Sequence, residues 1–358
     1  MRGQTTYRAG FVLTALLLLG LALVLGVSSA RGDVPGTYTV TKLNSDLPGL
    51  THTDPDLQNG WGIAEPATGP WWVADNGTDK STLYNADGSK RTLVVDIVNG
   101  APTGIVFNST PAFSVSANGK SGVPAFIFAS ESGTISGWSP NVDPTHSVVG
   151  TLTAGAVYKG LALASRSGQP QLYATDFVGG RVDVFNSTWG AGTATGGFLD
   201  PNLPSDYAPF GIAAVGGNLV VTFAKQEPGS EDELHHQGFG VVDEFDTDGN
   251  LISRIATHGQ LNAPWGIALA PSGFGPFSGD LLIGNFGDGH INAYARQNDG
   301  SWERAGGLRD ATGRTIAIDG LWGIGFGNDG AAGSSKTLYF AAGPNDENNG
   351  LFGSITAN

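Results

Sequence analysis

The stretch Trp61-Gly62-Ile63-Ala64 decides the fold, because five variants of it follow along the chain. In every copy a glycine is followed by Ile or Leu and then by a small or apolar residue. In most copies a bulky or ring-bearing residue precedes the glycine. The variants are Thr103-Gly104-Ile105-Val106, Lys159-Gly160-Leu161-Ala162, Phe210-Gly211-Ile212-Ala213, Trp265-Gly266-Ile267-Ala268 and Trp322-Gly323-Ile324-Gly325. The six glycines lie 42, 56, 51, 55 and 57 residues apart, a period typical of arrays of one supersecondary unit.

Strand-like runs follow the copies in a constant order. After the first copy come 70–75, 81–85 and 92–98, and Asp87-Gly88 supplies a tight turn before the last run. Comparable runs are 172–176, 181–185, 219–224, 241–245, 281–285 and 290–295. Four antiparallel strands repeated six times predict an all-β fold, a six-bladed β-propeller. The first strand of each blade would line the central channel, where neighbouring backbones crowd and glycine is favoured.

The sixth copy is short of one strand. After Trp322-Gly323 it has only the runs 337–341 and 350–356 before the chain ends at Asn358. The run 37–43 near the other end has the composition of a strand. We therefore expect this N-terminal strand to pair into the last blade and close the ring without a covalent link.

Composition agrees with a turn-rich β protein. The 358 residues include 56 Gly and 19 Pro, no Cys, 40% hydrophobic residues and 14% charged residues. This glycine content disfavours helical bundles, and the apolar content disfavours disorder. The net charge of −14 disfavours nucleic acid and anionic membrane surfaces as partners, whereas cations and neutral molecules fit it better.

The first thirty residues resemble an export signal. Arg2 and Arg8 precede an apolar run over 11–27, and Ser28-Ser29-Ala30 offers small residues for cleavage. We predict a signal peptide over 1–30, cleaved near Ala30, and one propeller domain over 31–358, secreted to an extracellular or periplasmic location. The alternative is an uncleaved anchor helix. No later apolar run is longer than a strand, so we expect no membrane span in the mature chain, and a monomer.

The first copy resembles the NHL-type repeats of six-bladed, TolB-like propellers. Its Trp-Gly-Ile-Ala strand is followed by Trp72-Val73-Ala74-Asp75 and by a hairpin that ends in Asp87-Gly88. Longer segments are similar to those of a family of exported bacterial proteins without a characterised function. They are 59–64, 102–108, 133–138, 157–161, 263–266 and 284–289. The resemblance implies the propeller fold and leaves the activity open.

The ends of the second strands meet at one mouth of such a channel. They carry carboxylates and amides that suit a divalent cation such as calcium, and six-bladed lactonases hold a metal at this place. The candidate metal ligands are Asp75, Asn76, Glu131, Asp176, Asn285 and Asp288. The competing interpretation is structural, because Asp and Asn at this point often bond to the backbone of the following turn. Glu131 and Lys225 are the least repetitive members, which favours a functional role for both.

Residues before the repeat glycines should edge the same mouth. Aromatic side chains there can stack on sugars, rings or quaternary cations. The candidate ligand-binding residues are Trp61, Lys159, Phe210, Trp265 and Trp322. Packing between blades explains the aromatic members equally well.

One long loop, 226–237, adds His235 and His236 beside several acidic residues. Imidazoles beside carboxylates bind transition metals or act as a general base, although a solvated acidic loop has the same composition. The candidate catalytic residues are Glu131, Lys225, His235 and His236.

Two functions remain open from the sequence. The first is a secreted binding module that presents its channel face to a neutral or cationic small molecule, carbohydrate or protein. The second is a calcium-type, metal-dependent hydrolase or lyase of the lactonase kind, with its site at the channel mouth. The fold alone does not choose between them.

Overall fold

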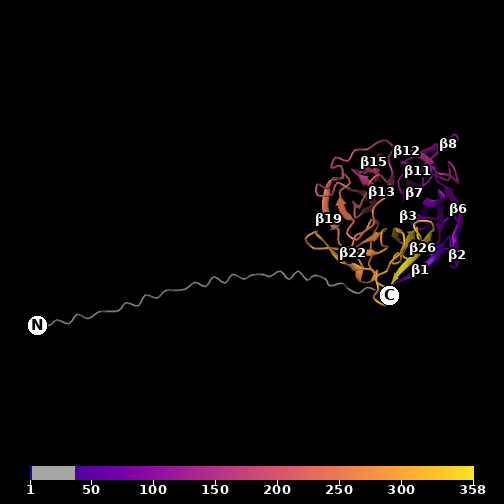
Figure 1. The fold of residues 1–358 in the computed structure, drawn as a ribbon. Coiled ribbons are helices and arrows are strands. Elements are labelled where there is room, and N and C mark those ends of the chain that lie inside the picture. The colour runs from indigo at the N-terminus through magenta and orange to yellow at the C-terminus, as the bar shows by residue number, and fades with distance from the viewer. Residues whose placement is uncertain (2–36) are drawn as a thin grey trace. The chain divides into compact units, whose positions relative to one another are not determined.

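Six β-sheets follow one another round a ring in chain order, which confirms the predicted six-bladed propeller (Figure 1). The computed structural model describes residues 37–358 together with Met1. The signal peptide expected over 1–30, with its cleavage site near Ala30, lies outside the described residues and stays a prediction. Within the described part of the chain, no helix has the length and apolar character needed to cross a bilayer.

Four blades have the predicted four-stranded core formed by one continuous stretch of chain. Blade one has β3 (Gly60–Ala64), β4 (Trp71–Asp75), β5 (Lys80–Tyr84) and β6 (Lys90–Asp96). Blade two has β7 (Pro102–Phe107), β10 (Phe126–Ser130), β11 (Thr134–Trp138) and β12 (Val148–Leu152), and a hairpin of β8 (Val115–Ala117) and β9 (Lys120–Gly122). Blade four has β16 (Tyr207–Val215), β17 (Asn218–Lys225), β18 (Val241–Phe245) and β19 (Leu251–Thr257). Blade five has β20 (Pro264–Leu269), β21 (Leu281–Asn285), β22 (Ile291–Arg296) and β23 (Trp302–Gly307).

Blade three departs from the predicted pattern, because its described sheet has three strands. They are β13 (Tyr158–Arg166), β14 (Gln169–Asp176) and β15 (Arg181–Phe185). The segment that follows contains four glycines and two prolines within 190–204, which disfavour a strand. Its Trp189 instead packs on Phe113 of blade two, with 5.2 Å between the ring centroids.

The last blade closes the ring as the sequence predicts. It contains β24 (Leu321–Phe326), β25 (Leu338–Ala342) and β26 (Leu351–Ala357), and β1 (Tyr38–Ser45) pairs antiparallel with β26, with Val40 opposite Ile355. The short β2 (His52–Thr53) adds to β1 in parallel. The hydroxyl of Tyr38, a buried residue, donates to the carbonyl of Phe274 at 3.2 Å. The pairing therefore links the two ends of the propeller domain in one sheet.

The repeat glycines lie where the innermost strands of adjacent blades approach each other. A Cβ atom on any of the six would come within 3.0 Å of a backbone atom of the next blade, and Gly323 would meet Trp61 to complete the ring. In every blade the pairing between the first and second strands also shifts register close to this glycine, as at a β-bulge. The glycine pattern thus reflects backbone contact between blades.

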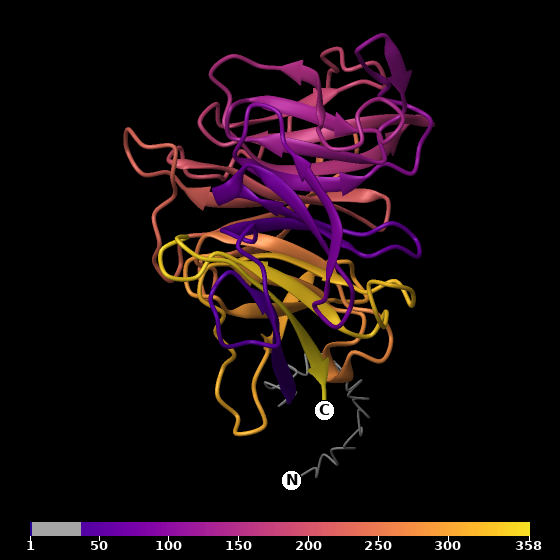
Figure 2. The ribbon, with the colours of Figure 1, turned by 90° about the vertical axis from the view of Figure 1, so that its right-hand side faces the viewer.

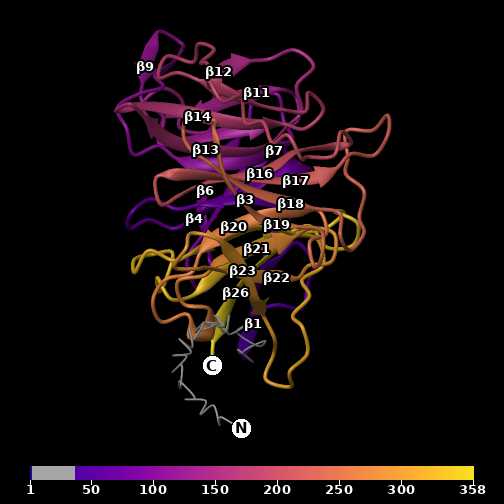
Figure 3. The ribbon, with the colours of Figure 1, turned by 90° about the vertical axis from the view of Figure 1, so that its left-hand side faces the viewer.

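The strands run between two faces that carry the loops (Figures 2 and 3). Inner strands begin, and second strands end, at the same face. The loop between β17 and β18 projects from that face (Figure 3). Between the faces, apolar clusters fill the gaps between neighbouring sheets, for example Trp72 of blade one stacked on Phe126 of blade two at 4.1 Å.

We expect Gly211→Ala to destabilise the propeller, because the new methyl group would collide with the carbonyl oxygen of Trp265. Overpacking of this kind lowers the free energy of unfolding by about 1–3 kcal/mol, measurable by urea denaturation. Gly307→Ala is the matched control, because there the nearest atoms lie at 3.3 and 3.5 Å. The explanation fails if both variants unfold at the same urea concentration.

Candidate functional site

A polar network covers one end of the channel, which we call the polar mouth. It is made by Asn59 before β3 and by residues of four loops, namely those between β4 and β5, β10 and β11, β17 and β18, and β25 and β26, together with Lys159 of β13. These loops join second strands to third strands, so the topology brings them together from distant parts of the chain. The members are Asn59, Asn76, Glu131, Lys159, Asp232, Glu233, His235 and Glu347.

Lys159 is the centre of the network. Its ammonium group donates to Glu131 Oε1 at 2.5 Å, lies 3.8 Å from Asp232 Oδ1 and sits 5.1 Å from the centroid of the Trp61 ring. The Lys159 side chain is only 1% exposed. Burial by itself lowers the pKa of Lys159, but the nearby carboxylates outweigh it and raise the pKa above its usual value. The lysine is therefore held as a buried cation.

Amide groups connect the carboxylates from different blades. Asn76 donates to the second oxygen of Glu131 at 3.0 Å, and Asn59 donates to Glu347 Oε1 at 2.9 Å and to Asn76 Oδ1 at 3.3 Å. Burial raises the pKa of Glu347, the hydrogen bond from Asn59 lowers it, and the neighbouring acids Glu233 and Glu131 raise it further. The result is a pKa above the usual value of a glutamate.

His235 and Glu233 form a pair in the loop between β17 and β18. The imidazole Nε2 lies 2.9 Å from Glu233 Oε1, and the edge of the ring meets Phe286 with 4.9 Å between centroids. Glu233 is buried, whereas the His235 side chain is 44% exposed. The bond to Glu233 raises the pKa of His235, and burial opposes the shift only in part. A base fixed by a carboxylate and open to solvent is suited to proton transfer.

Aromatic side chains close the channel beneath the polar mouth. Trp322 stacks on Trp61 at 3.6 Å and on Phe286 at 3.8 Å, and it meets Trp265 and Phe210, each at 5.7 Å. With Phe177 these five residues form what we call the aromatic plug. Two indole N–H groups tie the plug to the polar network, because Trp322 donates to Asn59 Oδ1 and Trp265 to the carbonyl of Lys159, both at 3.1 Å.

The five predicted ligand-binding residues all lie in or beside the plug. Trp61, Lys159, Phe210 and Trp322 are buried, and Trp265 is partly exposed. The structure therefore favours the packing interpretation for the aromatic residues before the repeat glycines. Sequence periodicity places them at the channel but does not distinguish a side chain facing a ligand from one facing another blade.

The six predicted metal ligands do not form one group. Asn76 and Glu131 meet in the polar network, but Asp176 pairs with Arg181 at 2.7 Å and accepts from the backbone N–H of Gly179. Asn285 donates to Asp288 at 3.0 Å within its own turn.

The side chain of Asp75 faces Thr82 and Asp54 and not the polar network, although Asn76 follows it directly in the chain. It is fully buried, which raises its pKa well above the usual value, and the charge of Asp54 adds to the shift. Within residues 37–358, no three His, Asp or Glu side chains are arranged to hold a metal ion.

The four predicted catalytic candidates divide into two pairs. Glu131 and His235 belong to the polar network. Lys225 instead pairs with Asp206 at 3.0 Å and lies 4.8 Å from the centroid of the Phe239 ring. His236 contacts the carbonyl of Gln237 at 2.7 Å and packs near Phe239. Among the described residues, no hydrogen bond or ion pair joins the side chain of Lys225 or His236 to the polar network.

Sequence reasoning missed four members of the polar network, namely Asn59, Asp232, Glu233 and Glu347, and two members of the aromatic plug, Phe177 and Phe286. Asn59 and Phe286 each lie within two residues of a predicted site position, namely Trp61 and Asn285, and Glu347 lies between the strand-like runs 337–341 and 350–356. Glu233 stands in the loop with His235, where an acid two residues before a histidine was the available signal. The contacts themselves join segments up to 288 residues apart, and no local pattern encodes them.

We expect the His235 ring to titrate above the ordinary histidine pKa of about 6.5, because Glu233 favours the imidazolium form. Glu233→Gln should move the midpoint down toward the ordinary value, as measured by NMR titration of the ring signals. Glu231→Gln, in the same loop and exposed, is the control and should leave it in place. If Glu233→Gln and Glu231→Gln moved the titration midpoint of His235 equally, the pairing of His235 with Glu233 would be contradicted.

Comparison with known proteins extends these observations. No family model matches the chain. It is 33% identical over 318 residues to "Uncharacterized protein L690" of Acanthamoeba polyphaga mimivirus, covering 85% of this chain and 81% of the relative. It is 35% identical over 321 residues to "Uncharacterized protein R648" of the same virus, covering 85% and 76%. These relatives are viral, so they give no support to the expected bacterial, exported family.

Solved structures share the fold at low identity. The PQQ-bound aldose sugar dehydrogenase of Streptomyces coelicolor superposes with a TM-score of 0.52 and 14% identity, over 90% of this chain and 99% of that one. A streptogramin B lyase gives a TM-score of 0.50 and 14% identity, over 90% and 98%. Likeness at this identity concerns the fold alone, whereas the identity to the viral proteins extends over most of each sequence. The chain therefore belongs to the family of six-bladed β-propeller proteins that includes these two mimivirus proteins.

Proposed function

We propose that the protein is a binding module whose polar mouth takes a hydrophilic cationic ligand, one that carries ammonium or guanidinium groups. The observation that carries the proposal is the buried Lys159, because the mouth already stabilises an ammonium group between Glu131 and the face of Trp61. Carboxylate and aromatic face together are the usual surroundings of a bound organic cation.

The charge balance of the polar mouth supports the same class of ligand. Glu131, Asp232, Glu233 and Glu347 lie around one lysine. Four carboxylates against one ammonium leave an excess of three negative charges when His235 is neutral, and of two when it is protonated. The Asp232 side chain is 69% exposed and that of Glu131 is 24% exposed, so both are within reach of a ligand. The net charge of the chain, −14, adds long-range attraction for cations.

We expect spermidine to bind the full chain, as measured by isothermal titration calorimetry in buffer of low ionic strength. The double variant Asp232→Asn/Glu347→Gln should weaken this binding by about fivefold, since part-exposed ion pairs contribute modestly. Added salt should weaken it as well.

The matched control for this titration is Glu303→Gln, which removes one carboxylate from β23, outside the polar mouth. This variant should bind spermidine as the unaltered chain does. Absence of binding, or an equal loss in the control, would contradict the proposal.

A second candidate, a hydrolase or lyase acting on a lactone-like substrate, is favoured by the His235–Glu233 pair. The exposed imidazole lies where it can accept a proton from water or from a substrate, and Glu233 stabilises the imidazolium that forms. The predicted calcium ion does not fit the mouth as the described residues form it, because both oxygens of Glu131 already accept hydrogen bonds, from Lys159 and from Asn76. Glu131 and Asn76 are the predicted ligands that remain together at the mouth.

This second candidate predicts turnover of a lactone by the full chain, assayed with and without added calcium. His235→Gln should lower the rate by about a hundredfold or more, the usual share of a general acid or base. Glu231→Gln should leave the rate unchanged, because Glu231 is an exposed residue of the same loop. If the lactone is not turned over with or without calcium, the hydrolase or lyase candidate is contradicted and the binding module remains the proposal for this mouth.

A further inference from the structure

A large cavity lies at the opposite end of the channel from the polar mouth. Its volume is about 1420 Å³, and it is lined by inner-strand residues of blades one to six together with loops of blades two and three. Trp265, a member of the aromatic plug, is among the lining residues. The cavity and the polar mouth are therefore on opposite sides of the plug. We call this space the apolar cavity.

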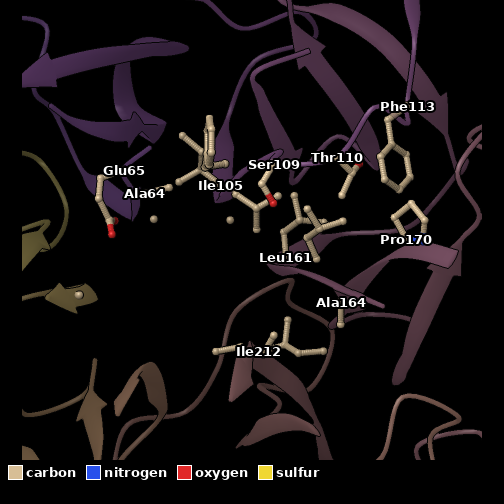
Figure 4. A pocket seen from close by; sticks show the side chains of 18 of the residues that line it. Ala64, Glu65, Ile105, Ser109, Thr110, Phe113, Leu161, Ala164, Pro170 and Ile212 are labelled. Atoms are coloured by element: carbon tan, nitrogen blue, oxygen red, sulfur yellow. The ribbon is translucent and has the colours of Figure 1, made fainter. Parts of the chain in front are cut away.

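The wall of the apolar cavity is a ring of branched aliphatic side chains. Each residue that follows a repeat glycine contributes to it. The ring consists of Ile63, Ile105, Leu161, Ile212, Ile267 and Ile324. Figure 4 shows Ile105, Leu161 and Ile212 from three different blades around the open space. A surface of this kind binds the hydrocarbon part of a ligand, and the volume exceeds the roughly 300–1,000 Å³ that a drug-sized molecule needs.

Of the described residues that line the apolar cavity, Glu65 alone is ionisable. It follows β3 directly and lies at the edge of the open space in Figure 4. Burial raises the pKa of Glu65 to about 7, and within residues 37–358 the only hydrogen bond that lowers it comes from its own backbone. Among the described residues no Lys, Arg or His pairs with this partly desolvated carboxylate beside an aliphatic wall, and a ligand can supply a cationic partner.

We infer that the apolar cavity is a second binding site, for a lipophilic amine whose ammonium group pairs with the Glu65 carboxylate while its hydrocarbon body packs on the aliphatic ring. The ammonium stabilises the ionised form of Glu65, which burial disfavours. The hydrocarbon gains by leaving water. This site is distinct in place and chemistry from the polar mouth, where the ligand is hydrophilic.

The test compares 1-aminoadamantane with its neutral analogue 1-adamantanol on the full chain. Binding is measured by calorimetry and by the fluorescence of Trp71, Trp189 and Trp265, which line the apolar cavity. At pH 8 the amine should bind more tightly than the alcohol. Glu65→Gln should weaken the amine by about tenfold and leave the alcohol unchanged.

The pH dependence gives an independent readout. Since Glu65 has a pKa of about 7, the carboxylate needed by the amine is lost as the pH falls below that value. The affinity for the amine should therefore drop by up to about tenfold between pH 8.5 and pH 5.5, the limit that the loss of the carboxylate in Glu65→Gln also sets, and Glu65→Gln should abolish this dependence. The affinity for the alcohol should stay constant over the same range in both chains.

Two controls locate the site. Ile63→Trp should fill part of the apolar cavity and weaken both probes, and Ala213→Leu serves the same purpose if the first variant unfolds. Glu303→Gln, on the outer strand β23, should leave both affinities unchanged. Equal affinity for amine and alcohol at pH 8, an unchanged amine affinity in Glu65→Gln, or failure of both probes to bind would overturn the inference.

Discussion

The close approach of neighbouring backbones at the channel is the constraint on which the rest of the structure depends. At each repeat glycine, the inner strand of one blade lies so near the next that even a methyl group has no room. Hydrogen bonds reinforce this contact, for example from Thr103 to the carbonyl of Tyr158 at 2.7 Å and from Thr175 to that of Phe210 at 2.6 Å. Six such contacts, together with the β1–β26 pairing, close the ring without disulfides.

The same constraint divides the channel. The residues before and after each repeat glycine serve different ends of the channel, because the inner strands begin at the polar mouth and run toward the apolar cavity. Those before it, such as Trp61 and Trp322, pack together as the aromatic plug, and those after it form the aliphatic ring of the apolar cavity. One short repeat therefore produces a polar mouth and an apolar cavity that differ in the ligands they suit.

Electrostatics set the polar mouth apart from an ordinary acidic surface. A buried ammonium is stable only where carboxylates and hydrogen bonds replace its lost hydration. Lys159 meets this condition through Glu131. The additional acids Glu233 and Glu347 increase the density of negative charge around Lys159, and the network contains no second permanent cation. Apart from this cluster, several candidate acids such as Asp176 satisfy turns, which is the usual role of such residues in propeller blades.

The sequence by itself determined the number of blades, the place of the repeat glycines and the closing strand near Val40, because periodicity and strand composition are local properties that survive in one dimension. Tertiary structure alone decided the burial of Phe210 and Trp322, and the meeting of Asn59 with Glu347. It also decided that Glu65 lies at an apolar cavity. The reason is physical: side-chain direction, burial and charge pairing depend on contacts between segments far apart in the chain, and these contacts exist only once the ring has closed.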